Sequence, residues 1–125
     1  MPDEVYLRSI DIYAVKRNTP LHLAVAIGLG QIGSVVLDWD GQMIEPDDIE
    51  NIPVGRAGED LRGRILGVIV KVKDVNESTN RTNVSCVFTG GRRAKTFDYS
   101  LTVTGAGGYA HYNLDFLFIS GGRRP

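Results

Sequence analysis

The chain has 125 residues, of which 42% are hydrophobic and 23% charged, and its formal net charge is −1. These values are typical of one globular domain and exclude an intrinsically disordered or fibrous chain. No apolar run approaches the roughly 18 residues of a membrane-spanning helix, and the single cysteine excludes an internal disulfide.

Alternating hydropathy predicts strands along most of the chain. Between Leu21 and Leu29, leucine, valine and isoleucine occupy every second position, and the same period recurs in later segments. Side chains two residues apart share one face of a strand, so each such run buries one face. We predict strands near residues 5–15, 21–29, 34–39, 64–75, 83–89, 96–104 and 109–119.

The first predicted strand has an irregular pattern. Its apolar positions shift from Val5 and Leu7 to Ile10 and Ile12. A bulge inserts one extra residue and so reverses which face the following side chains occupy. We therefore predict a bulge at residues 8–9.

Residues 42–63 lack a sustained period and contain two prolines and three glycines. We predict a long surface loop there, with one helical turn at 57–62, and a flexible basic tail at 120–125. Seven strands without a helix long enough for a crossover predict one domain over residues 1–125. The expected fold is an all-β, antiparallel β-sandwich of about seven strands, with a small β-barrel as the alternative.

Residues 28–33 read G-x-G-x-x-G after a predicted strand, which is the pattern of a dinucleotide-binding turn. In that fold a helix begins at the glycines and its amide groups face the phosphates. Here β-branched residues follow, and Asp40-Gly41 soon marks a hairpin. We therefore predict a glycine-rich connection between two strands and no cofactor.

The predicted hairpin after residue 89 carries three cations, Arg92, Arg93 and Lys95. Clustered cations neutralise phosphates or acidic partners, so these three residues are candidates for an anion or partner contact. The alternative is a solvated turn whose charges protect a sheet edge from pairing. A net charge of −1 makes general nucleic-acid binding unexpected.

Six acidic residues and no lysine or arginine lie within residues 38–50. Oxygen ligands of this kind suit a hard cation, which makes Asp38, Asp40 and Asp47 candidate metal ligands. The spacing is not that of an EF-hand loop. We predict no metal cofactor, and a loose acidic loop is the simpler interpretation.

No catalytic residue is predicted, and we expect that the protein is not an enzyme. His22 and His111 lie on the polar face of their strands, and neither has a nucleophile or acid at a spacing that indicates a triad. Cys86 lies on the buried face, where a thiol behaves as a small apolar group. A deep pocket that joined either histidine to a carboxylate would change this interpretation.

Two strands are apolar on both faces, with Ile65 and Ile69 in one and Leu117 and Ile119 in the other opposite the predicted core. Apolar residues on an outward face mark a partner surface unless residues 42–63 cover them. Charge is also divided, because residues 1–62 carry a net charge of −6 and residues 63–125 carry +5. Head-to-tail contact between copies is therefore one hypothesis.

The sequence favours a non-catalytic β-sandwich that acts through protein–protein contacts, as a homo-oligomer or as a subunit of an assembly. The acidic start of the chain lacks the apolar region of a secretory leader, so we expect a cytoplasmic protein without a membrane partner. The alternative function is a carbohydrate or small-ligand binding module. Three aromatic residues and two polar ones are its candidate contacts: Trp39, Tyr109, Tyr112, Asp38 and Asn113.

Overall fold

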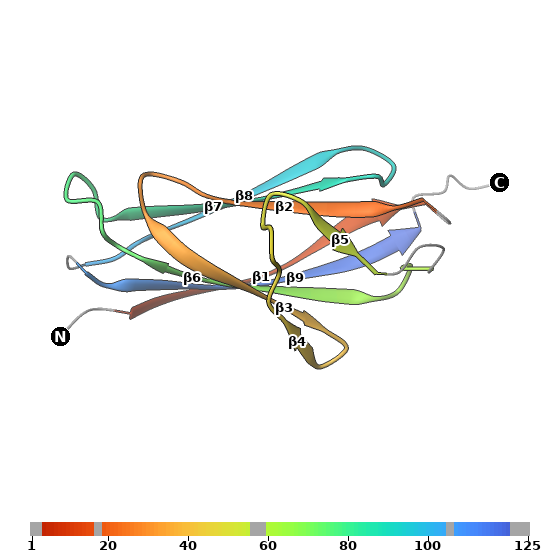
Figure 1. Cartoon of the computed structure of the whole chain (residues 1–125), viewed down its shortest axis with the longest axis horizontal. Helices are drawn as coiled ribbons and strands as arrows, with labels where there is room; N and C mark the ends of the chain where they lie inside the picture. The colour runs from red at the N-terminus through yellow and green to blue at the C-terminus, as the bar shows by residue number, and fades with distance from the viewer. Residues whose placement is uncertain (1–3, 17–18, 56–59, 105–106, 121–125) are drawn as a thin grey trace.

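The computed structural model describes residues 4–16, 19–55, 60–104 and 107–120. They form two sheets packed face to face, with strands and no helix among them (Figure 1). The strands are β1 (Glu4–Val15), β2 (Leu21–Ile27), β3 (Ile32–Trp39), β4 (Gln42–Ile44), β5 (Ile52–Val54), β6 (Ile65–Lys73), β7 (Arg81–Thr89), β8 (Lys95–Thr102) and β9 (Tyr109–Ser120). The β-sandwich prediction is confirmed, and the described strands form no closed barrel.

The five-stranded sheet has the order β1-β9-β6-β3-β4, and the four-stranded sheet has the order β5-β2-β7-β8. Neighbouring strands are antiparallel except β1 and β9, which run parallel from the pair Glu4 and Tyr109 to the pair Val15 and Ser120. No turn joins the first strand to the last, so their directions are not forced to oppose. This pair corrects the expectation of a purely antiparallel sandwich.

β1 contains no bulge, which corrects the prediction for residues 8–9. Its register with β9 runs without interruption over all 12 residues. Val5 and Leu7 pack against the core, whereas Ile10 and Ile12 remain exposed on the opposite face. The apolar side chains of β1 therefore change from the inward face in its first half to the outward face at Ile10 and Ile12.

The inward face of β1 holds a polar pair where isoleucine was expected. Asp11 accepts hydrogen bonds from the hydroxyls of Ser9, at 2.8 Å, and Tyr99 on β8, at 2.5 Å. Burial, followed by the hydrogen bond to Asp11, raises the pKa of Tyr99 above its ordinary value. The Tyr99 hydroxyl therefore stays protonated and donates to the carboxylate.

Residues 42–63 are not simply a surface loop, which is a second correction. They contain β4 and β5, and they bury Ile52, Val54 and Leu61 in the core. Each strand is three residues long and shows too little alternation to be recognised. Part of the predicted helical turn, and the basic tail beyond residue 120, lie outside the described residues, while residues 60–62 are not helical.

An aromatic cluster fills the space between the sheets. The ring of Phe88 on β7 packs against Tyr13 of β1 and against Phe97, Phe116 and Phe118, with centroid distances from 4.8 to 6.1 Å. Burial of one such side chain stabilises a fold by roughly 1.5–3 kcal/mol. The cluster joins β1 and β9 of one sheet to β7 and β8 of the other.

The glycine-rich segment at residues 28–33 connects β2 to β3, as the sequence predicted. Leu29 and Gly30 have positive φ angles of 61° and 69°, which turn the chain tightly enough for β3 to begin at Ile32. Gly33 lies so close to β6 that an added Cβ would stand 2.5 Å from the carbonyl oxygen of Lys71. Two of the glycines thus serve a turn and a close strand approach.

Candidate interaction surfaces

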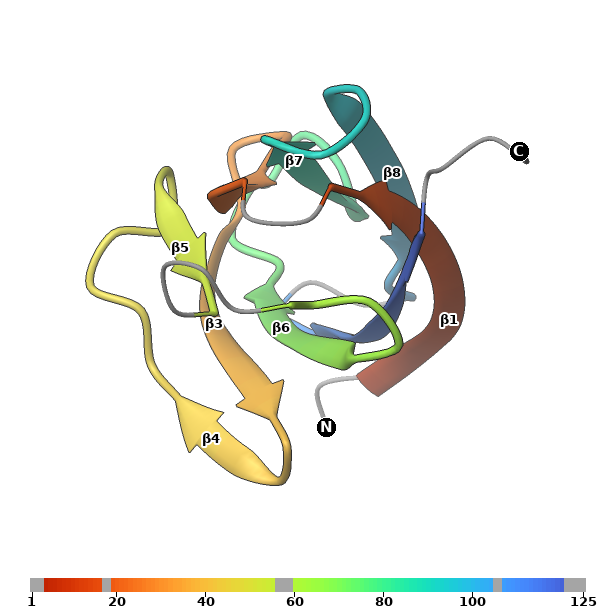
Figure 2. The same ribbon diagram turned by 90° about the vertical axis from the view of Figure 1, so that its right-hand side faces the viewer.

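The outward side of the five-stranded sheet, which we call the outer face, is organised in rows by strand register. One row contains Ile10, Asp115, Gly67 and Asp38, and the next contains Ile12, Leu117 and Ile65. Each row crosses β1, β9 and β6, so residues far apart in sequence form one continuous surface. In Figure 2, β1 lies along the outer side of the sandwich, and none of the described strands is drawn outside it.

Large apolar side chains project from the outer face into solvent. Their exposed fractions are 64% for Tyr6, 77% for Ile10, 53% for Ile12, 58% for Ile32 and 54% for Ile65. The described strands of the 42–63 segment do not cover them, because β4 extends the edge of the same sheet and β5 belongs to the other sheet. Isolated exposed apolar residues are common, but a group on one sheet face marks an interaction site.

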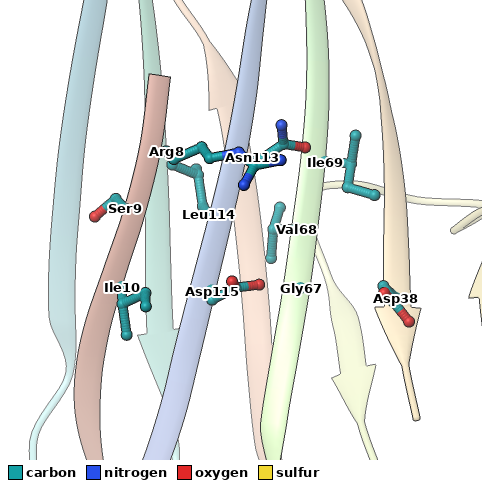
Figure 3. A pocket seen from close by; sticks show the side chains of 10 residues that line it. All are labelled: Arg8, Ser9, Ile10, Asp38, Gly67, Val68, Ile69, Asn113, Leu114 and Asp115. Atoms are coloured by element: carbon teal, nitrogen blue, oxygen red, sulfur yellow. The ribbon is translucent and has the colours of Figure 1, made fainter. Parts of the chain in front are cut away.

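A groove of about 420 Å³ crosses the outer face at Gly67 (Figure 3). Asp38 and Asp115 lie on either side of this glycine, and Arg8 extends over Asn113 at one end of the groove. A Cβ at position 67 would stand 3.1 Å from the Cβ of Asp38. The missing side chain therefore keeps the groove open.

An aromatic and charged cluster lies at the end of the outer face where β1 and β9 begin. Nε2 of His111 is 2.7 Å from Oε1 of Glu4, and the Tyr6 ring stacks on His111 with centroids 4.6 Å apart. The Lys71 ammonium lies over the ring of Tyr109 at 4.4 Å. His111 thus meets a carboxylate on an open surface, and it is not among the residues that line the grooves at Gly67, at Arg92 and at Asp40.

The three predicted cations Arg92, Arg93 and Lys95 come together along one groove of about 270 Å³, which we call the basic groove. The hairpin that carries them is fixed to β1. The Arg92 amide donates to the carbonyl of Ala14 at 3.0 Å, and the Tyr13 hydroxyl donates to the carbonyl of Arg93 at 2.5 Å. The cations are therefore presented on an anchored hairpin, with Ile12 and Ile119 completing the wall.

The three candidate metal ligands do not come together, because Asp38 and Asp40 line one groove and Asp47 is not among its lining residues. Asp38 accepts a hydrogen bond from the amide of Gly41 at 3.0 Å, Asp40 forms an ion pair with Arg64, and Asp47 is exposed on the segment after β4. In the described ranges no three histidine, cysteine or acidic side chains are placed to hold a metal ion.

Two other residues with reactive side chains are Cys86 and His22, and each has a reactive atom that is buried. Cys86 is fully buried, and burial raises the pKa of its thiol to about 12, with a smaller effect from Asp98. Nδ1 of His22 is buried without a hydrogen-bond partner in the described part of the chain. Neither residue lines one of the grooves described above.

Of the aromatic residues proposed for a carbohydrate site, one is buried and the other two each have a cation over the ring. Tyr112 is fully buried, and its hydroxyl lies 2.5 Å from that of Thr82. Arg64 lies over the ring of Trp39 at 4.4 Å, as Lys71 does over Tyr109. Asp38 and Asn113 do line the groove at Gly67, so the polar half of that candidate site is present.

The sequence interpretation missed the apolar side chains that β1 contributes to the outer face. It treated Ile10 and Ile12 as core residues after a bulge, and it did not single out Tyr6. The available signal was the unbroken alternation from Glu4 through Tyr6 and Arg8 to Ile10, which places all of them on one face. Ile65 and Leu117 were predicted to face away from the core, and they lie opposite each other on the outer face.

No known protein family matches this chain, and no curated protein or solved structure matches it significantly. A search of the described residues for a membrane-spanning helix, long and apolar enough to cross a bilayer, finds none.

Proposed function

We propose that this protein is a non-catalytic β-sandwich that acts by binding another protein chain through the outer face of its five-stranded sheet. The observation that carries the proposal is the set of solvent-exposed isoleucines on one sheet face, with Ile10 and Ile12 on β1 and Ile65 on β6, on either side of β9. Removing apolar surface from water is favourable by about 25 cal/mol per Å². A partner that covers this face therefore gains binding free energy by removing the isoleucine side chains from water.

Charged and polar groups lie around the isoleucines, and they would set the orientation of a bound partner. Arg8, Asp38 and Asp115 line the groove at Gly67; Asp38 and Asp115 share a row with Ile10, and Arg8 pairs with Asn113 in a neighbouring row. Interfaces combine an apolar centre with a polar rim, and the rim sets orientation and partner choice more than affinity. The outer face has both components.

Site-specific photo-cross-linking in the cells that make the protein tests this proposal. A photoreactive benzoylphenylalanine replaces Ile10 in one version and Ser100 in the control, because Ser100 is exposed on the four-stranded sheet. We expect a discrete adduct with one defined protein, which is either a second copy or another chain, from position 10 and not from position 100. Equal labelling at both positions, or no adduct from position 10, would show that the outer face is not a binding surface.

A further inference from the structure

The basic groove lacks a counterion of its own. None of its lining residues is acidic, and Arg92, Arg93 and Lys95 have no carboxylate partner among the described residues. Lys95 instead lies over the ring of Phe97 at 4.9 Å. An apolar wall beside three unpaired cations suits a ligand that is both apolar and acidic.

The groove is also continuous with the outer face. Ile12 lines the groove, and it also belongs to the row of the outer face that contains Leu117 and Ile65. A ligand that lies across this boundary meets isoleucine first and then the cations. The surface therefore has an order, apolar followed by basic.

One described segment of the same chain has the matching order. Met43 and Ile44 of β4 are 60% and 40% exposed, and the acidic residues that follow are also exposed: Glu45, Asp47, Asp48 and Glu50. None of these four has a cationic partner in the described residues. Figures 1 and 2 show that the β3–β4 hairpin projects away from the body of the sandwich.

The two complementary features lie at opposite edges of one sheet, because β1 is the first strand and β4 the last in the order β1-β9-β6-β3-β4. One molecule cannot bring its own β4 segment into its own groove across three intervening strands. A contact between two copies uses a different surface from each, and such contacts repeat into a ring or a chain.

We propose that the basic groove binds residues 43–48 of a second copy of this chain, so that copies associate head to tail. The inference rests on the proposed function, since it names the partner and extends the outer face into the groove. Because the contact pairs exposed cations with exposed carboxylates, its affinity falls as salt screens them.

Sedimentation velocity of the full chain tests the contact. We expect assemblies larger than a monomer at about 50 mM salt and at least a tenfold weaker apparent affinity at about 500 mM. Two double variants each remove one side, Arg92→Gln with Arg93→Gln, and Asp47→Asn with Asp48→Asn. The second keeps the oxygen that accepts the Glu50 amide at 2.9 Å, so the local turn is preserved.

Each double variant alone should be monomeric. An equimolar mixture retains one intact groove and one intact segment, so it should form a dimer and nothing larger. Glu77→Lys and Arg81→Glu are charge-changing controls at other exposed positions, and they should associate like the unmodified chain.

A monomer at every salt concentration, or association unaffected by either double variant, would overturn the head-to-tail contact. If a cross-link at position 10 then still captures a different protein, the outer face binds a partner and only the identity of that partner is wrong. If the Arg92→Gln and Arg93→Gln changes instead abolish binding to an oligonucleotide while copies do not associate, the groove serves nucleic acid and the proposal fails.

Discussion

Replacement of Gln31 by leucine should strongly destabilise the protein, because this one side chain links two turns. Its buried amide nitrogen donates to Oδ1 of Asp74 and to the carbonyls of Thr79 and Arg81, at 3.0, 3.3 and 3.1 Å. Its oxygen accepts from the amides of Val75 and Asn76, at 2.7 and 2.9 Å. Leucine has a similar volume and can make none of these bonds.

The size of the effect follows from the groups left without a partner. A buried donor or acceptor that loses its partner costs about 1–3 kcal/mol, and more when it is charged. Asp74 is the critical group, since it is only 4% exposed and its second oxygen already has no described partner. Water can reach the exposed β6–β7 turn and satisfy its amides, so we expect a net loss of about 3 kcal/mol rather than the full sum.

Urea unfolding followed by circular dichroism measures this loss as a change in the free energy of unfolding. Gln42→Leu is the matched control, because Gln42 is exposed on β4 and should change stability by less than about 0.5 kcal/mol. If Gln31→Leu unfolds within about 0.5 kcal/mol of the unmodified chain, the two turns are held by something other than this amide, and the reasoning is refuted.

Three further predictions concern the core and the hairpins. Tyr13→Phe should cost about 1–2 kcal/mol in urea unfolding, because it removes the hydroxyl that donates to Arg93 and accepts from the Gly91 amide; no loss would mean that the hairpin is anchored elsewhere. Gly90→Ala should lower the free energy of unfolding by about 3 kcal/mol or more, because its φ is +97° and a Cβ would stand 2.0 Å from the Pro20 carbonyl oxygen. Gly41→Ala is the control: its φ is +81° but a Cβ there meets open space, so it should cost about 1 kcal/mol. The Cys86 thiol should resist a thiol reagent in the folded protein, and rapid labelling of the folded protein would contradict its burial. Because burial raises the thiol pKa to about 12, the free energy of unfolding should fall as the pH rises from 9 toward 12. A Cys86→Ala variant should show a smaller fall over that range.

The long strands were predictable because burial acts on every second residue. In β6 and β7 an apolar residue recurs at every second position from Leu66 to Val72 and from Val84 to Phe88, and all of these core positions are buried. β4 and β5 were not predictable in this way, because three residues do not establish a period. Their positions are set by pairing with β3 and β2, which only the three-dimensional structure reveals.

The cations of the candidate site were predictable as a cluster, but the groove was not. Arg92, Arg93 and Lys95 are close in sequence, so a hairpin brings them together. Their groove also needs Ile12 from β1 and Ile119 from β9, which lie far away in the chain. No local pattern indicates that the β7–β8 hairpin is anchored to β1 through the Tyr13 hydroxyl.

The misread strand β1 is itself an argument for a binding surface. The hydropathy rule places apolar residues in the core, and it fails for this strand. On β1 the isoleucines at positions 10 and 12 face solvent, whereas the polar residues at positions 9 and 11 face the other sheet. The inward carboxylate requires two hydroxyl donors, one of them from Tyr99 on the opposite sheet. For folding alone the reverse pattern would bury more apolar surface and need no such network. The observed pattern is therefore expected if an outward isoleucine on β1 meets a partner, which is the contact that the outer face provides.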